Sequence, residues 1–106
     1  MSFIFTNHKT GENIKSDDSQ NYDELLALLR KMTTPKNTLI TTLPSGIGLD
    51  FEVQEDGELW IEFYGGEPSG AFVTMAEAEE VVKRAFQGIN KNIKNSYADL
   101  ISEWEY

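Results

Sequence analysis

Few residue types in this chain can act as a nucleophile, a base or a soft metal ligand. The 106 residues include one histidine, His8, and no cysteine. These counts exclude a thiolate nucleophile, a zinc–thiolate site and any site built from two histidines of this chain. A serine–histidine–aspartate arrangement would need His8 as its base. Because His8 lies in a polar stretch near the N-terminus, we interpret it as a surface residue.

Carboxylates are the abundant reactive groups, with 18 aspartates and glutamates. Two paired carboxylates perform acid–base chemistry when their surroundings raise the pKa of one above that of the other. The central candidates fall on a hairpin whose outer face we expect to be exposed, where nothing would separate the two pKa values. The sequence therefore predicts a protein that is not an enzyme, and a small enzyme with paired carboxylates is an alternative.

Two short segments have the composition of ligand-binding loops but lack the required pattern. The residues around Asp56 do not provide the alternating oxygen ligands and later glutamate of a calcium loop. Gly65 and Gly66 have the composition of a phosphate-binding loop, but Glu67 follows them and would repel a phosphate. We therefore expect a turn at these glycines, and neither a metal nor a cofactor.

The overall charge bears on the class of partner. The chain has 9 lysines and arginines against 18 acidic residues, which gives a formal net charge of -9. Such a charge opposes direct binding to nucleic acid or to an anionic membrane, and it favours a basic partner. Hydrophobic residues make up 40% of the chain, and its length suits one domain over residues 1–106. With no long apolar run and no basic leader segment, we expect a cytoplasmic protein.

Two amphipathic helices are predicted from apolar residues that recur at helical spacing. The first begins after Asn21, which we expect to cap it, and its apolar stripe extends to Met32. The second begins after Thr74, because Thr74 and Glu77 have the spacing of a capping box in front of an apolar stripe.

Alternating or β-branched apolar runs predict strands at residues 3–5, 39–43, 49–53, 59–63 and 71–73. The polar stretch 9–20 is expected to be a loop, and residues 100–106 are a candidate final strand. Together these elements predict an α+β fold. We expect a single-layer antiparallel sheet of about four to five strands, with two amphipathic helices packed on one face.

The register of the central hairpin follows from its turn. A two-residue loop at Asp56 and Gly57 would place Val53 opposite Trp60 and mix apolar with polar side chains. A three-residue loop over 55–57, with Gly57 in the left-handed conformation, keeps the apolar side chains on one face. In that register Leu49 lies opposite Phe63, Phe51 opposite Ile61 and Val53 opposite Leu59. We therefore predict the three-residue loop.

The outer face of this hairpin concentrates negative charge. No lysine or arginine occurs between Lys36 and Lys83. In the predicted register Asp50 lies opposite Glu62, a like-charge pair that is unfavourable for folding. Large aromatic side chains surrounded by charge are typical of protein interfaces with strong anchors. We therefore predict a partner-binding surface made by Asp50, Glu52, Glu55, Asp56, Glu58, Trp60, Glu62, Tyr64 and Glu67.

Two other interpretations of this surface stay open. In the first, it is the solvated outer face of a protein that is simply acidic and uses the face for no partner. In the second, a helix covers Trp60 and Tyr64, so that the sheet is buried on both sides. Exposure of these two aromatic rings distinguishes the second interpretation from a binding surface.

The order of three motifs resembles a known family. The segment 61–67, which reads Ile-Glu-Phe-Tyr-Gly-Gly-Glu, leads into a short strand and the capped helix, and the chain then finishes on Glu103, Trp104 and Glu105. This succession is similar to the first-numbered family of immunity proteins from bacterial polymorphic-toxin and contact-dependent growth inhibition systems. The resemblance covers roughly the C-terminal half of the chain.

The resemblance implies a cytoplasmic, single-domain protein that blocks a cognate toxin by binding it. Toxins associated with the family are nucleases and deaminases, whose substrate clefts are basic. We therefore expect an immunity protein that occludes the nucleic-acid-binding or active site of a basic toxin domain, with its oligomeric state left open. An acidic nucleic-acid mimic that inhibits a host or defence enzyme is the alternative.

Overall fold

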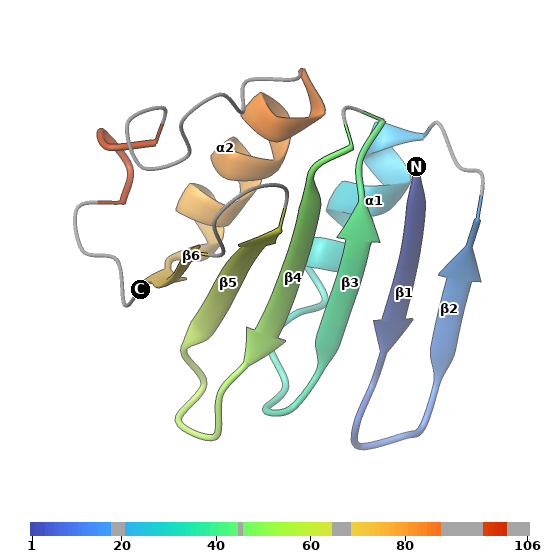
Figure 1. Cartoon of the computed structure of the whole chain (residues 1–106). Helices are drawn as coiled ribbons and strands as arrows, with labels where there is room; N and C mark the ends of the chain where they lie inside the picture. Colours follow the sequence, from blue (N-terminus) through green and yellow to red (C-terminus); the bar gives the residue numbers. More distant parts are fainter. Residues whose placement is uncertain (18–20, 45, 65–68, 88–96, 102–106) are drawn as a thin grey trace.

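The computed structural model describes residues 1–17, 21–44, 46–64, 69–87 and 97–101. Its main element is one antiparallel sheet, in which six strands follow the order β2-β1-β3-β4-β5-β6 (Figure 1). The strands are β1 (Ser2–Thr6), β2 (Asn13–Ser16), β3 (Thr38–Thr42), β4 (Gly48–Val53), β5 (Leu59–Tyr64) and β6 (Ser69–Val73). The helices are α1 (Tyr22–Leu29) and α2 (Met75–Phe86). The α+β class and the single sheet are confirmed, and the predicted number of strands was too low.

The additional strand is β2, which lies in the stretch predicted to be a loop. It pairs with β1 and places Ile14 opposite Phe5. The turn between the two strands contains Gly11 at φ 76, a conformation that glycine adopts without a steric penalty. Because β2 has little apolar alternation of its own, pairing with β1 rather than local pattern makes it a strand.

The central hairpin has the predicted register. Leu49 lies opposite Phe63, Phe51 opposite Ile61 and Val53 opposite Leu59. Gly57 has φ 88, and its amide donates to the carbonyl oxygen of Gln54 at 2.9 Å. The three-residue loop with a left-handed glycine is therefore confirmed.

Both helices begin at the predicted caps. The Asn21 side chain accepts a hydrogen bond from the Glu24 amide, and Thr74 and Glu77 form a reciprocal capping box. Helix α1 ends at Leu29, earlier than its apolar stripe predicts, because the chain continues in turns that still bury Met32. Neither of these described helices is long and apolar enough to cross a membrane.

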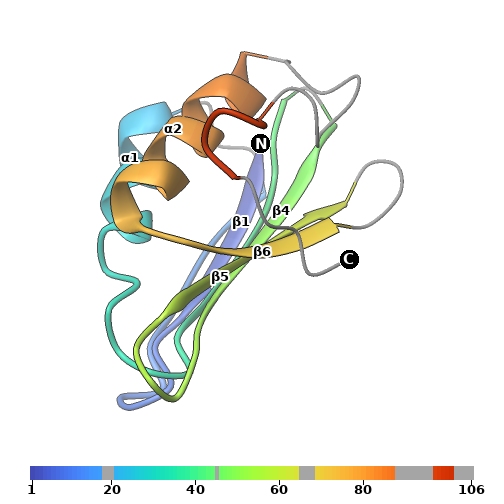
Figure 2. The same cartoon turned by 90° about the vertical axis from the view of Figure 1, so that its left-hand side faces the viewer.

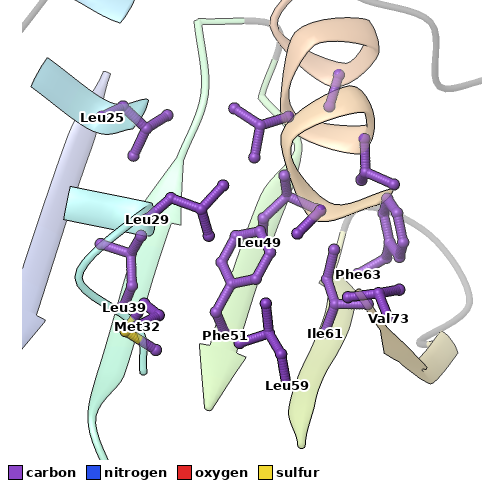
Figure 3. Packing of buried hydrophobic residues seen from close by; sticks show 14 of the residues in the cluster. Leu25, Leu29, Met32, Leu39, Leu49, Phe51, Leu59, Ile61, Phe63 and Val73 are labelled. Carbon is purple, nitrogen blue, oxygen red and sulfur yellow. The ribbon is translucent and has the colours of Figure 1, made fainter. Parts of the chain in front are cut away.

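The core lies between the helices and one face of the sheet (Figure 3). Both helices are on the same side of the sheet, as predicted (Figure 2). They also contact each other, because the Arg30 guanidinium pairs with Glu79 at 2.6 Å and the rings of Tyr22 and Phe86 lie 5.1 Å apart. Inward side chains of the strands are almost completely buried, among them Phe5, Leu39, Phe51, Ile61 and Phe63.

Residues 97–101 pack on α2 and β5. The buried ring of Tyr97 lies 5.2 Å from that of Phe63, and burial raises the pKa of Tyr97 to about 12. Asp99 accepts two hydrogen bonds from the Arg84 guanidinium, each 2.8 Å long, and these lower the pKa of the Asp99 carboxyl. Residues 97–100 form a turn, so the described part of the candidate final strand is not a strand. The rest of that candidate lies outside the described residues.

Candidate functional site

The sheet face opposite the helices is called the open face below. It is formed by the side chains that alternate with the core residues along each strand. One row across it contains Lys15, Ile4, Ile40, Asp50 and Glu62. The next row contains Thr38, Glu52, Trp60 and Phe72, and Tyr64 lies at the end of β5. The register therefore brings five predicted site residues together: Asp50, Glu52, Trp60, Glu62 and Tyr64.

Glu62 links the two aromatic side chains that β5 contributes to the open face, Trp60 and Tyr64. Its Oε1 atom accepts a hydrogen bond from Trp60 Nε1 at 2.9 Å, and its Oε2 atom accepts one from the Tyr64 hydroxyl. The ring of Phe72 meets the Trp60 indole edge-on, with centroids 4.8 Å apart. These contacts hold the indole in one orientation on the open face.

A glycine of β6 provides the space for that indole. A Cβ atom at Gly70 would lie 2.5 Å from Cζ2 of Trp60, closer than carbon atoms can approach. Gly70 lies opposite Glu62 in the register, next to the pairing of Trp60 with Phe72. The position of the indole therefore depends on the absence of a side chain at residue 70.

Asp50 is a carboxyl group of the open face whose pKa is perturbed. It lies directly opposite Glu62 and is half-buried. Burial, and then the nearby negative charge of Glu62, raise the pKa of Asp50. The expectation that nothing on this face would raise a carboxyl pKa was therefore wrong, because β3 and the neighbouring side chains shield Asp50 from water.

A small pocket opens beside Asp50. Its volume is about 140 Å³, and Ile40, Asp50, Glu52, Trp60 and Glu62 contribute to its lining. Within the part of the chain that the structure describes, no hydrogen bond or ion pair reaches the Asp50 side chain. The pocket therefore combines a half-buried carboxylate with an aromatic wall.

Three other predicted site residues lie at the tip of the hairpin. Glu55, Asp56 and Glu58 are exposed, and Lys36 approaches Glu55 at 3.8 Å. Asp56 also has a structural role, because its Oδ1 atom accepts a hydrogen bond from the Glu58 amide at 3.0 Å. A hollow of about 500 Å³ connects Glu55 and Asp56 with Glu52 and Phe72. The tip is thus continuous with the open face, whereas Glu67 lies outside the described residues.

The open face also contains apolar residues that the sequence analysis did not assign to it. Beside the predicted Tyr64 (41%), the large hydrophobic side chains exposed there are Ile40 (48%), Phe72 (46%) and Ile4 (39%). The alternation within each strand was the available signal. Phe3 and Phe5 point into the core, so Ile4 between them points outward. Trp60 is half-buried by its sheet neighbours, and the described helices lie on the other face.

His8 lies in the turn after β1. The backbone amide of His8 donates to Asn37 Oδ1 at 3.0 Å, which attaches the turn after β1 to the start of β3. Among the described residues, no group of three or more histidine, aspartate or glutamate side chains is arranged to hold a metal ion.

Comparisons with protein-family models, with curated proteins and with solved structures find no match for this chain. The resemblance to the immunity family therefore stays a prediction. The last three residues of its 61–67 motif and all of its 103–105 motif lie outside the described residues. Any assignment of function rests on the chemistry of the open face.

Proposed function

We propose that this protein is an immunity protein that binds a cognate basic toxin domain through the open face. Binding occludes the nucleic-acid-binding or active site of the toxin, a nuclease or deaminase, in the cytoplasm of the cell that makes both. The observation that carries the proposal is the composition of this face. Four exposed apolar or aromatic side chains accompany three carboxylates on the side of the sheet opposite the described helices.

The two kinds of side chain perform different parts of the binding. Apolar side chains that lose contact with water supply most of the affinity, and the aromatic cluster around Trp60 provides the rigid centre typical of strong interfaces. The carboxylates of Asp50, Glu52 and Glu62 attract a basic partner and orient it as it approaches. A standard interface covers about 800 Å² on each partner, a modest part of the 5861 Å² surface of the described chain.

The apolar residues also bear on the nucleic-acid mimic. A mimic replaces phosphates with carboxylates, and exposed isoleucines such as Ile4 and Ile40 do not imitate any charged group of nucleic acid. These residues favour one dedicated protein partner over a set of nucleic-acid-binding enzymes. For an enzyme that would use Asp50 and Glu62 as its paired carboxylates, the pocket beside them, at about 140 Å³, is smaller than the roughly 300–1,000 Å³ of most small-molecule sites.

Co-expression tests the proposal directly. Cells that produce the cognate toxin domain should survive when the wild-type chain is present. The double variant Glu52→Lys/Glu62→Lys should lose protection, because it reverses two charges of the open face. The matched control is Glu12→Lys/Asp17→Lys, which makes the same charge change at exposed positions flanking β2.

Two outcomes would contradict the proposal. One is equal protection by the open-face variant and by its control, with both variants folded as judged by circular dichroism. The other is binding of the wild-type chain to several unrelated nucleic-acid-binding proteins with similar affinities, which would indicate a mimic. A slower association rate for the open-face variant, together with a weaker dependence on salt, would support electrostatic attraction to a basic partner.

A further inference from the structure

We propose that the pocket beside Asp50 binds one arginine side chain of the partner, with the guanidinium paired to Asp50 and stacked on Trp60. This inference rests on the proposed function, since it names the group of the partner that the open face recognises. It adds a defined site to a surface that the sequence marked only as acidic and aromatic.

The size of the pocket matches a single side chain. A water molecule occupies about 30 Å³ of liquid, so a pocket of about 140 Å³ has room for a group as large as several waters. Its walls are chemically distinct. Ile40 offers apolar surface for the methylene groups of a long side chain, and Trp60 offers an aromatic surface for a planar cation.

The charge of the pocket favours a cation. Asp50 is half-buried and faces the negative charge of Glu62, which disfavours its ionised form. Among the described residues, the cation on the same row as Asp50 is Lys15. It lies three strand spacings, or about 14 Å, from Asp50. Lys36, near the hairpin tip, pairs with Glu55 instead. A cation from a partner would therefore relieve the repulsion between Asp50 and Glu62.

Arginine fits these walls better than lysine does. A guanidinium is planar, is less strongly hydrated than an ammonium, and forms two parallel hydrogen bonds with one carboxylate. The indole that it would stack on is already oriented, because Glu62 accepts its N–H and Phe72 packs against its ring. Trp60 therefore loses little side-chain entropy when the ligand binds.

The experiment uses the isolated chain and two peptides, N-acetyl-Gly-Arg-Gly-amide and its lysine counterpart, titrated while NMR spectra are recorded. We expect saturable shifts of the Trp60 indole N–H and the Asp50 amide with the arginine peptide. The lysine peptide should bind about threefold more weakly, because an ammonium is more strongly hydrated and cannot form two parallel hydrogen bonds with the Asp50 carboxylate. Asp50→Asn should abolish saturation, whereas the control Glu12→Gln, which removes an exposed carboxylate outside the pocket, should leave it unchanged.

The inference is overturned if the arginine peptide shifts exposed carboxylate residues generally, with no saturation at Trp60. It is also overturned if Asp50→Asn binds the peptide as well as the wild type does. These failures differ from failure of the proposed function. Loss of protection by Glu52→Lys/Glu62→Lys without a peptide site at Trp60 would retain the immunity role and reject the arginine pocket. Conversely, an arginine-peptide site at Trp60 in a wild-type chain that gives no protection against the toxin would retain the arginine pocket and reject the immunity role.

Discussion

Asp50 and Glu62 lie directly opposite each other at the centre of the open face, on β4 and β5. Like charges in this cross-strand position destabilise a sheet by repulsion. The same arrangement places two carboxylates beside an oriented indole, where they can meet a basic partner. We infer that this pair lowers the stability of the fold and favours binding of a basic partner. The first prediction separates the effect on stability from the effect on binding.

Asp50→Asn should stabilise the fold at neutral pH. The pKa of Asp50 is raised in the folded state, so its contribution to stability is present below its unfolded pKa near 3.8 and is lost as pH rises through the folded pKa. Urea denaturation should therefore give similar free energies of unfolding for Asp50→Asn and for the wild type at pH 3. At pH 7 the variant should be more stable by about 0.5 kcal/mol, since partial exposure screens the repulsion. A variant less stable than wild type at pH 7 would contradict this account.

Gly70→Ala should displace the Trp60 indole. The new Cβ atom would lie 2.5 Å from Cζ2 of Trp60, so the ring must leave its contact with Phe72 and its hydrogen bond to Glu62. We expect the free energy of unfolding to fall by about 1–2 kcal/mol, as for other overpacked sites. The control is the same glycine change in a Trp60→Leu background. A similar loss in both backgrounds would mean that the indole is not the cause.

Gly57→Ala should destabilise the hairpin without changing its register. Gly57 has φ 88, and an L-residue with a Cβ atom pays a steric penalty there of about 1 kcal/mol. Nothing lies within 4 Å of the position of that Cβ atom, so the penalty is conformational and not a clash. Gly57→Asn should lose less stability, because asparagine tolerates the left-handed region better. Chemical denaturation should show that the wild type is the most stable of the three proteins, Gly57→Asn less stable and Gly57→Ala the least stable.

Thr74→Ala should weaken the start of α2. The Thr74 hydroxyl accepts a hydrogen bond from the Glu77 amide at 3.2 Å, and Glu77 accepts one from the Thr74 amide at 2.8 Å. Loss of such a cap costs about 1 kcal/mol. Glu77→Gln is the matched control, since glutamine keeps the acceptor oxygen of the capping box. A thermal melt that shows equal losses for both variants would contradict the role of the Thr74 hydroxyl.

Ile40→Ser should separate binding from folding. Ile40 is 48% exposed on the open face, so its replacement should change the free energy of unfolding by less than about 0.5 kcal/mol. If the toxin domain buries this side chain, the dissociation constant measured by calorimetry should rise about tenfold. Ala76→Ser, at an exposed position of α2, is the control and should leave affinity unchanged. Unchanged affinity for Ile40→Ser would place the interface elsewhere.

Some features of this protein are fixed by residues close together in the chain. The caps at Asn21 and Thr74 could be predicted because each bond joins residues three positions apart. The register of the β4–β5 hairpin could also be predicted, because Gly57 and the period-two alternation of the strands allow one loop length. The same local logic placed Asp50, Glu62, Trp60 and Tyr64 on one face.

Other features arise only when distant segments meet. Strand β2 forms because β1 offers an edge to pair with, and its few residues carry too little alternation to indicate a strand. The row that joins Ile4 and Ile40 to Asp50 exists because β3 pairs with both β1 and β4.

The sequence by itself determined that this chain is acidic, has one hairpin with carboxylates and aromatic rings on its outer face, and covers the inner face with amphipathic helices. These properties depend on composition, on spacing and on short-range geometry. The tertiary structure decided that Asp50 is half-buried beside an oriented indole, with exposed isoleucines next to it. Burial and electrostatic perturbation depend on neighbours from other strands, and no local pattern contains that information.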